Sequence, residues 1–209
     1  ELKVVISGGG AAGCAVSRLL LDFGVGSLTI SDIAGAVYRG RPGLNPDLAG
    51  LAERTNPLAL RGGLRDILPG ADVFIGVSAP NLLTADDIAA MNPGAIVFAM
   101  ANPVPEIMPD EALSGGAAVV GSGRSDYRNQ INNALAFPGI FRGALDVRAR
   151  EINQEMKLAA AQAIASLVSP AELAEGLIMP PAFSPVLAPT VAKAVARAAI
   201  DSGAARIFG

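Results

Sequence analysis

The sequence predicts an α/β protein with a doubly wound, mostly parallel sheet flanked by helices. Short apolar runs rich in β-branched residues alternate with segments whose apolar residues recur at helical spacing. A glycine cluster, Gly8 to Gly13, stands directly between the first apolar run and the first helical pattern. Alternating elements of this kind bring successive strands parallel to one another, with the helices packed on the two faces of the sheet.

Three segments form the first β-α-β unit. Leu2–Ser7 is a short apolar run that predicts a buried strand, and Ala11–Phe23 carries apolar residues at helical spacing. Gly24 and Gly26 are candidates for the end of this helix, because glycine accepts the left-handed conformation found there. Ser27–Ser31 then predicts the second strand.

The alternation continues beyond this unit. Further strands and helices are expected in turn at Pro46–Arg54 (helix), Asp72–Val77 (strand), Thr84–Met91 (helix), Gly94–Ala101 (strand), Asp110–Leu113 (helix) and Ala117–Gly121 (strand). After these comes a long helix at Ala149–Val168, which Pro170 ends, and a last helix at Thr190–Asp201. We expect one nucleotide-binding domain over residues 1–209, in which 149–209 form a helical C-terminal extension.

The composition excludes several classes of function. The chain of 209 residues has a net charge of −3 and no Lys/Arg cluster, which argues against binding nucleic acid. It has no histidine, so a Ser-His pair, a histidine base and a His-ligated metal are absent from it. No apolar run approaches the roughly 18 residues that cross a membrane. The single cysteine, Cys14, and the lack of a signal-peptide pattern favour a cytoplasmic location.

The glycine cluster predicts a dinucleotide site. Gly8, Gly10 and Gly13 form a GxGxxG pattern between a strand and a helix, as in a Rossmann-like unit. At such a turn the backbone N–H groups of the first helical turn, here at Ala11 and Ala12, meet the pyrophosphate. The alternative is a tight turn that serves packing alone.

Asp32 strengthens this interpretation. It follows the second predicted strand at close to the spacing of about 20 residues at which an acidic side chain binds the adenosine ribose. A carboxylate there favours NAD over NADP, because it repels the 2′-phosphate. The alternative is a solvated aspartate with no ligand.

Further candidates follow other strands. Ser78 and Ala79 come after the strand at Asp72–Val77, at the edge of the sheet where ligands bind, although an ordinary turn also explains them. Asn102 comes after the next strand, and its amide suits a nicotinamide carboxamide or a substrate hydroxyl; an Asx turn before proline is the alternative. Arg124 could pair with a substrate carboxylate, but we expect it to pair with Asp126 or to serve only at the surface.

With these residues in view, the sequence resembles the nicotinamide-binding domain of prokaryotic malic enzymes. The resemblance implies oxidation of L-malate by NAD, with NADP as the alternative, and metal-assisted loss of CO2 to give pyruvate, with Mg2+ or Mn2+ as the metal. The segments that carry it are Ser7–Gly13, Gly40–Arg41, Leu44–Pro46, Thr55–Pro57, Leu60–Gly62, Ala71–Pro80, Phe98–Ala112, Gly121–Tyr127, Asn129–Val147 and Ile152–Ser166.

The resemblance also assigns roles. It places Gly10 to Gly13 at the pyrophosphate, Asp32 at the ribose, and Ser78 with Ala79 along the cofactor. It puts Asn102 near the nicotinamide and the substrate, and it gives Asn133 a hydrogen bond to malate.

The catalytic tyrosine, the catalytic lysine and the metal-ligating carboxylates of the family precede the glycine motif, in segments that this chain lacks. We therefore expect no catalytic and no metal-binding residue here, and binding of cofactor without turnover. The expected partners are L-malate and pyruvate, the missing N-terminal domain and further copies in a homo-oligomer. Two alternatives remain: a malolactic-type lyase domain, which retains NAD and releases lactate, and a stand-alone nucleotide-binding module.

Overall fold

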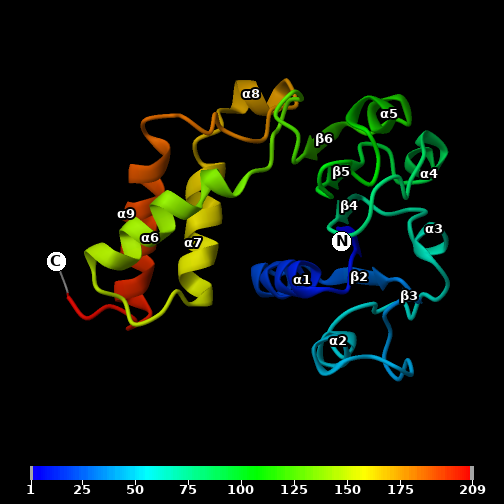
Figure 1. Cartoon of the computed structure of the whole chain (residues 1–209), viewed down its shortest axis with the longest axis horizontal. Coiled ribbons are helices and arrows are strands. Elements are labelled where there is room, and N and C mark those ends of the chain that lie inside the picture. The colour runs from blue at the N-terminus through cyan, green and yellow to red at the C-terminus, as the bar shows by residue number, and fades with distance from the viewer. Residues whose placement is uncertain (1, 208–209) are drawn as a thin grey trace. The chain divides into compact units, whose positions relative to one another are not determined.

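The computed structural model describes residues 2–207, and the chain divides into two compact units, Glu1–Arg128 and Asn129–Gly209 (Figure 1). The second, helical unit therefore begins at Asn129, before the helical extension that we expected from residue 149. It begins earlier because helix α6, Phe137–Asp146, packs against the helices that follow it.

The first unit is built on a six-stranded sheet, which confirms the predicted fold class. The strand order is β3-β2-β1-β4-β5-β6, and all neighbours are parallel except β2 and β3. The strands are β1 Lys3–Ser7, β2 Ser27–Asp32, β3 Gly35–Ala36, β4 Val73–Gly76, β5 Ile96–Ala99 and β6 Val119–Ser122. Ser7 of β1 pairs with Ser31 of β2 and with Gly76 of β4, so these three strands end at the same edge.

Both faces of the sheet are buried, as expected for parallel strands covered by helices. Val4 and Ile6 of β1 belong to one apolar cluster, whereas Val5 belongs to another. This alternation follows from the two-residue period of a strand. The helices of this unit are α1 Ala11–Phe23, α2 Pro46–Ala52, α3 Leu64–Ile67, α4 Ala85–Ala89 and α5 Pro109–Ser114.

The second unit contains the short 3-10 helix η1 Asn133–Leu135 and the helices α6, α7 Gln154–Ala165, α8 Pro170–Ala174 and α9 Leu187–Asp201. Figure 1 shows α6 and α7 running beside α9. Two glycines of α6 allow the close approach. A Cβ at Gly139 would lie 2.5 Å from Cβ of Val191, and one at Gly143 would lie 2.3 Å from the carbonyl oxygen of Ala192.

The start of α7 differs from the expectation. We predicted a helix from Ala149, but α7 begins after Asn153, whose side chain accepts a hydrogen bond from the N–H of Met156 at 3.1 Å and caps the helix.

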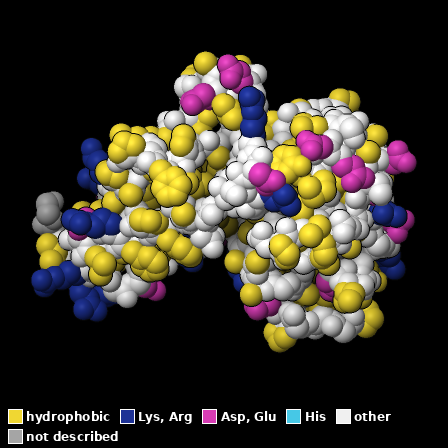
Figure 2. Space-filling view, turned by 45° about the horizontal axis from the view of Figure 1, so that its top comes forward, with side chains coloured by type: hydrophobic (Ala, Val, Ile, Leu, Met, Phe, Trp, Pro, Cys, Tyr) yellow, Lys and Arg dark blue, Asp and Glu magenta, His cyan; other side chains and the backbone are white. Residues whose placement is uncertain are grey.

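The outer side of α6 is apolar. Phe137, Phe141 and Leu145 follow one another at helical spacing and are between 51% and 72% exposed. Hydrophobic side chains also gather on the face of the helical unit seen in Figure 2. No described helix is both long and apolar enough to cross a membrane.

Candidate functional site

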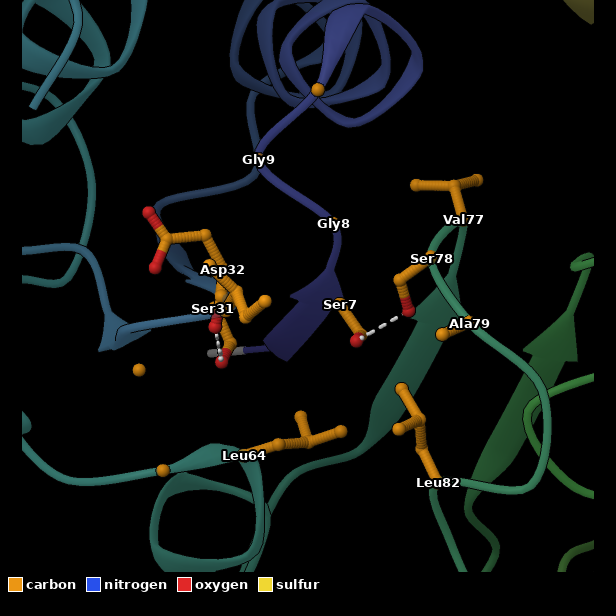
Figure 3. Close-up of a pocket in the computed structure, with 14 residues that line it drawn as sticks. Ser7, Gly8, Gly9, Ser31, Asp32, Leu64, Val77, Ser78, Ala79 and Leu82 are labelled. Carbon is orange, nitrogen blue, oxygen red and sulfur yellow. Dashed lines mark hydrogen bonds between the residues drawn. The ribbon is translucent and has the colours of Figure 1, made fainter.

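A cavity of about 530 Å³ lies at the edge of the sheet where β1, β2 and β4 end. In Figure 3 the β1 turn separates Asp32 on one side from Ser78 on the other, and Leu64 and Leu82 stand across the cavity. The lining residues are Ser7–Gly10, Ser31–Ile33, Gly35, Gly63, Leu64, Val77–Ala79 and Leu82. Ligands of open α/β sheets bind at this edge.

The three glycines of the motif have different physical roles. Gly8 has a φ of +131°, and a Cβ there would lie 2.7 Å from the carbonyl oxygen of Val77. A Cβ at Gly13 would lie 1.8 Å from the carbonyl oxygen of Gly8, so this glycine lets α1 pack against the turn. Gly10 lines the cavity, and a Cβ there would meet no heavy atom within 4 Å. The backbone is therefore accessible to a ligand at Gly10.

The N-terminus of α1 opens beside this cavity. The N-cap residue of α1 is Gly10, which has no side chain to accept hydrogen bonds from the first turn, and the first turn contains no acidic residue. The N–H groups of Ala11 and Ala12 belong to the first turn, where a helix has no acceptor of its own for them. Together with the positive end of the helix dipole, they form a site for an anionic group.

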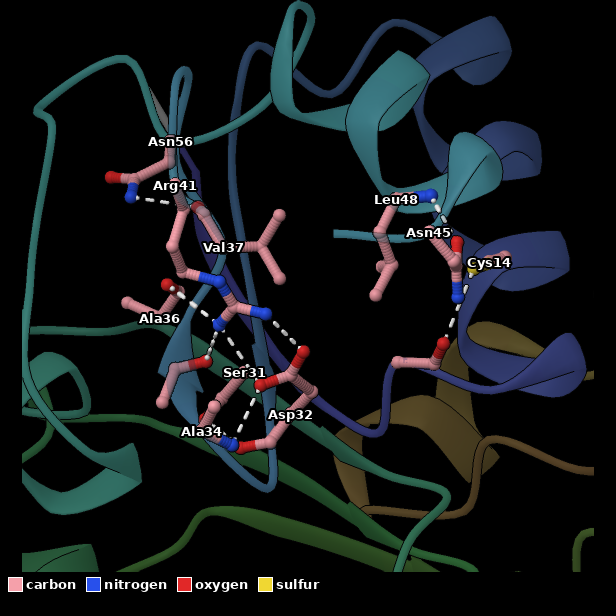
Figure 4. Close-up of polar contacts among 12 residues, drawn as sticks. Cys14, Ser31, Asp32, Ala34, Ala36, Val37, Arg41, Asn45, Leu48 and Asn56 are labelled. Atoms are coloured by element: carbon pink, nitrogen blue, oxygen red, sulfur yellow. Dashed lines mark hydrogen bonds and ion pairs between the residues drawn. The ribbon is translucent and has the colours of Figure 1, made fainter. Parts of the chain in front are cut away.

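Asp32 lies at the end of β2 and lines the cavity. Both of its carboxylate oxygens accept hydrogen bonds from the guanidinium of Arg41 (Figure 4). The N–H of Ala34 donates to Oδ1 at 2.8 Å. The hydrogen bond from Arg41 is the main cause that holds the pKa of Asp32 below its usual range, against the opposing effect of burial. The carboxylate is thus charged and fixed in position.

Ser78 is held through both its hydroxyl and its backbone N–H. Its hydroxyl shares a hydrogen bond of 2.8 Å with the hydroxyl of Ser7, and its N–H donates to Oε1 of Glu106 at 2.8 Å. Glu106 is fully buried, and its Oε2 accepts a hydrogen bond of 3.0 Å from the N–H of Ala101. One carboxylate therefore joins the loop after β4 to the loop after β5.

The two candidate amides occupy different units. Asn102 is exposed in the loop after β5 and does not line the cavity; its Nδ2 donates to the carbonyl oxygen of Met100 at 3.3 Å. Asn133 is exposed at the start of η1 in the helical unit, where its carbonyl oxygen accepts a hydrogen bond from Ala136.

Two other side chains lie outside the proposed chemistry. Cys14 is 3% exposed and packs in the core, and burial raises the pKa of its thiol. Arg124 pairs with Asp126 through two hydrogen bonds, of 2.9 Å and 2.6 Å.

Four residues that line the cavity or support its lining were not among the predicted site residues. Ser7 and Ser31 could have been found, because Ser7 ends β1 and Ser31 stands one residue before the end of β2, at the ligand-binding edge. Arg41 and Glu106 could not have been found in this way, because each lies in a loop rather than at the end of a strand.

The family model for "Malic enzyme, NAD binding domain" matches residues 1–200. The chain belongs to this family. The predicted resemblance to the nicotinamide-binding domain of malic enzymes is confirmed.

Three curated relatives show how far the likeness extends. A bifunctional malic/malolactic enzyme of Bacillus subtilis is 54% identical, over 99% of this chain and 51% of its own length. An NAD-dependent malic enzyme of Geobacillus stearothermophilus is 52% identical, over 99% of this chain and 43% of its own length. An NADP-dependent malic enzyme of Rhizobium meliloti is 43% identical, over 98% of this chain and 29% of its own length. This malic-enzyme domain spans about half, or less, of the length of these relatives.

A solved structure supports the same conclusion. The crystal structure of a malic enzyme from Pyrococcus horikoshii matches with a TM-score of 0.92 and 41% identity, over 100% of this chain and 50% of the other. The fold of the malic-enzyme domain is therefore shared over the whole of this chain.

Proposed function

We propose that the cavity at the end of β1, β2 and β4 binds NAD+, with NADP+ as an alternative ligand. The pyrophosphate lies at the N-terminus of α1, on Gly10 to Gly13, with Gly8 making the turn. The ribose hydroxyls bind to Asp32, and Ser78 with Ala79 lies along the path of the cofactor. The observation that carries this proposal is the open backbone at Gly10, beside uncapped N–H groups and a fixed carboxylate.

We also propose that the two amides serve the far end of the cofactor and the substrate. Asn102 stands after β5, at the same edge of the sheet as the cavity, where its amide suits the nicotinamide carboxamide. Asn133 donates a hydrogen bond to L-malate. The support for Asn133 is the chemistry of its amide and its match to the family.

The reaction itself is a proposal for the longer protein. There, L-malate is oxidised at C2, its hydride passes to NAD+, and CO2 is lost to give pyruvate. Residues 1–209 serve as the NAD(P)-binding domain, while the remaining part supplies the acid and the base. We propose that the assembled enzyme is a homo-oligomer.

We propose that the metal ion of the longer protein is held by the part that precedes the glycine motif. Among residues 2–207, no group of three His, Cys, Asp or Glu side chains is placed to hold a metal ion. Its ligands, like the acid and the base, belong to the proposal for the longer protein.

A second function is favoured by one observation. The relative from Bacillus subtilis is named for both malic and malolactic activity. In a malolactic reaction the enzyme retains NAD, and L-malate yields lactate and CO2. The longer protein incubated with L-malate and NAD+ distinguishes the two: pyruvate and free NADH support the malic reaction, whereas lactate without net NADH supports the malolactic one.

Cofactor binding is tested separately by calorimetric titration of this chain with NAD+ and NADP+. The proposal predicts saturable binding of one nucleotide per chain. The absence of heat with both nucleotides, from a chain that circular dichroism shows to be folded, would overturn it.

A further inference from the structure

Arg41 stands directly behind the carboxylate that is proposed to bind the ribose. Its Nη1 donates to Oδ1 of Asp32 at 2.9 Å, and its Nη2 donates to Oδ2, as Figure 4 shows. The side chain of Arg41 is 9% exposed and that of Asp32 is 16% exposed. The pair is thus largely withdrawn from water, where its electrostatic influence on a ligand is weakly screened.

The backbone fixes Arg41 in this place. Nη1 also donates to the carbonyl oxygens of Gly35, at 2.9 Å, and of Ala36, at 3.1 Å. These residues form β3, which pairs with the end of β2. The guanidinium is therefore held by the same strand pair that positions Asp32, and it cannot turn away without breaking these hydrogen bonds.

The carboxylate retains capacity for a ligand. Oδ1 accepts from Ala34 and from Arg41, whereas one hydrogen bond to Oδ2, that from Arg41, is present. Since each carboxylate oxygen accepts about two hydrogen bonds, Oδ2 can accept a ribose hydroxyl as well. Asp32 lines the cavity but Arg41 does not, so Arg41 acts on a ligand through Asp32.

We infer that Arg41 neutralises the charge of Asp32 and thereby allows the cavity to accept NADP+ as well as NAD+. The inference rests on the proposed function of the cavity. In NADP+, a 2′-phosphate replaces the ribose hydroxyl, and a bare carboxylate repels it. The Asp32–Arg41 pair has no net charge, which removes most of this repulsion. Arg41 is therefore a positioning residue that determines specificity.

Two other arginines of this unit, Arg39 and Arg61, are engaged elsewhere. Arg39 is exposed and pairs with Glu53, with Nε and Oε2 2.8 Å apart. The guanidinium carbon of Arg61 lies over the ring of Tyr38, at 4.7 Å from its centre. Arg39 thus provides a matched control: it is an arginine of the same segment, and its removal leaves Asp32 untouched.

The experiment compares dissociation constants for NADP+ and NAD+ in calorimetric titrations of the chain, at low and at high salt. Arg41→Met exposes the charge of Asp32, and the Kd for NADP+ relative to that for NAD+ is expected to rise about tenfold or more. Asp32→Asn leaves Arg41 uncompensated, and the same ratio is expected to fall. Arg39→Met is expected to leave it unchanged. Because the pair is largely withdrawn from water, the shifts are expected to shrink only slightly at high salt.

A purely structural role would weaken both nucleotides equally and leave the ratio as it is. An unchanged ratio in Arg41→Met, with both nucleotides still bound, would overturn this inference alone. If Arg41→Met does not fold, the inference is tested with Asp32→Asn. It is then overturned if the Kd for NADP+ relative to that for NAD+ does not fall in this variant. An unmodified chain that binds neither nucleotide would overturn the proposed function, and this inference with it.

Discussion

Glu106 accepts a hydrogen bond from the N–H of Ser78 at 2.8 Å, across 28 positions of sequence. Its second oxygen accepts from the N–H of Ala101, so the two loops that follow β4 and β5 are joined at one buried carboxylate. The proposed cofactor contacts at Ser78 and Asn102 are positioned by these loops. The geometry of the site therefore depends on a side chain that does not line the cavity.

Glu106→Gln is expected to destabilise the protein. An amide has one oxygen acceptor, so one of the two backbone N–H groups would face an NH2 group and lose its partner. A buried donor without a partner costs about 1–3 kcal/mol in the free energy of unfolding. Urea unfolding measures this change. The matched control is Glu111→Gln, because Glu111 is exposed and accepts a longer hydrogen bond of 3.3 Å from Ala85. Equal stability of the two variants would contradict the account.

Gly13→Ala is expected to disturb the fold itself. The new Cβ would lie 1.8 Å from the carbonyl oxygen of Gly8, and α1 would have to move away from the turn. Overpacking of this kind costs about 1–3 kcal/mol of stability. Gly50→Ala in α2 is the control, because a Cβ there meets no heavy atom within 4 Å and alanine favours a helix. Thermal unfolding should place the melting temperature of Gly13→Ala below that of the wild type, and that of Gly50→Ala at or above it.

The Asp32–Arg41 pair predicts a dependence of stability on pH. The pKa of Asp32 is lowered in the folded state, mainly by its hydrogen bond to Arg41. The pair therefore stabilises the protein fully above the unfolded pKa of about 3.9, and this contribution is lost as the pH falls towards the lower folded value.

Unfolding free energies of the wild type and of Asp32→Asn, measured from pH 7 to pH 3, test this. The wild type should be more stable at pH 7, and the difference should shrink below about pH 4. Asp47→Asn breaks an exposed pair with Arg18 and should give a small difference throughout. A gap between wild type and Asp32→Asn that is constant with pH would show that the charge of Asp32 does not contribute.

The first β-α-β unit was predictable because its signals are local. The predicted helix Ala11–Phe23 is the observed α1, and Gly24 ends it at a φ of +103°. The roles of the motif glycines also follow from the sequence, since each is set by contacts within one turn or with the neighbouring strand.

Two features could not be predicted, for physical reasons. Small residues and amides are dense around the segment Phe137 to Gly139, and this composition does not predict a helix. The segment forms the start of α6 instead, since Gly139 and Gly143 are needed for close packing on α9. That packing brings together residues about 50 positions apart in the sequence, so no local sequence pattern predicts it. The pairing of Arg41 with Asp32 is likewise set by the path of β3.

Gly10→Ala tests the central claim, that a dinucleotide lies on the open backbone at the start of α1. The residue has a φ of −84° and open space around its Cβ position, so the variant should fold with at most a small loss of stability. Its methyl group would stand where the pyrophosphate is proposed to lie. Calorimetric titration with NAD+ should show a Kd at least about tenfold weaker than in the wild type or in Gly50→Ala, which corresponds to about 1.4 kcal/mol. Unchanged affinity in a folded Gly10→Ala variant would contradict the proposed site.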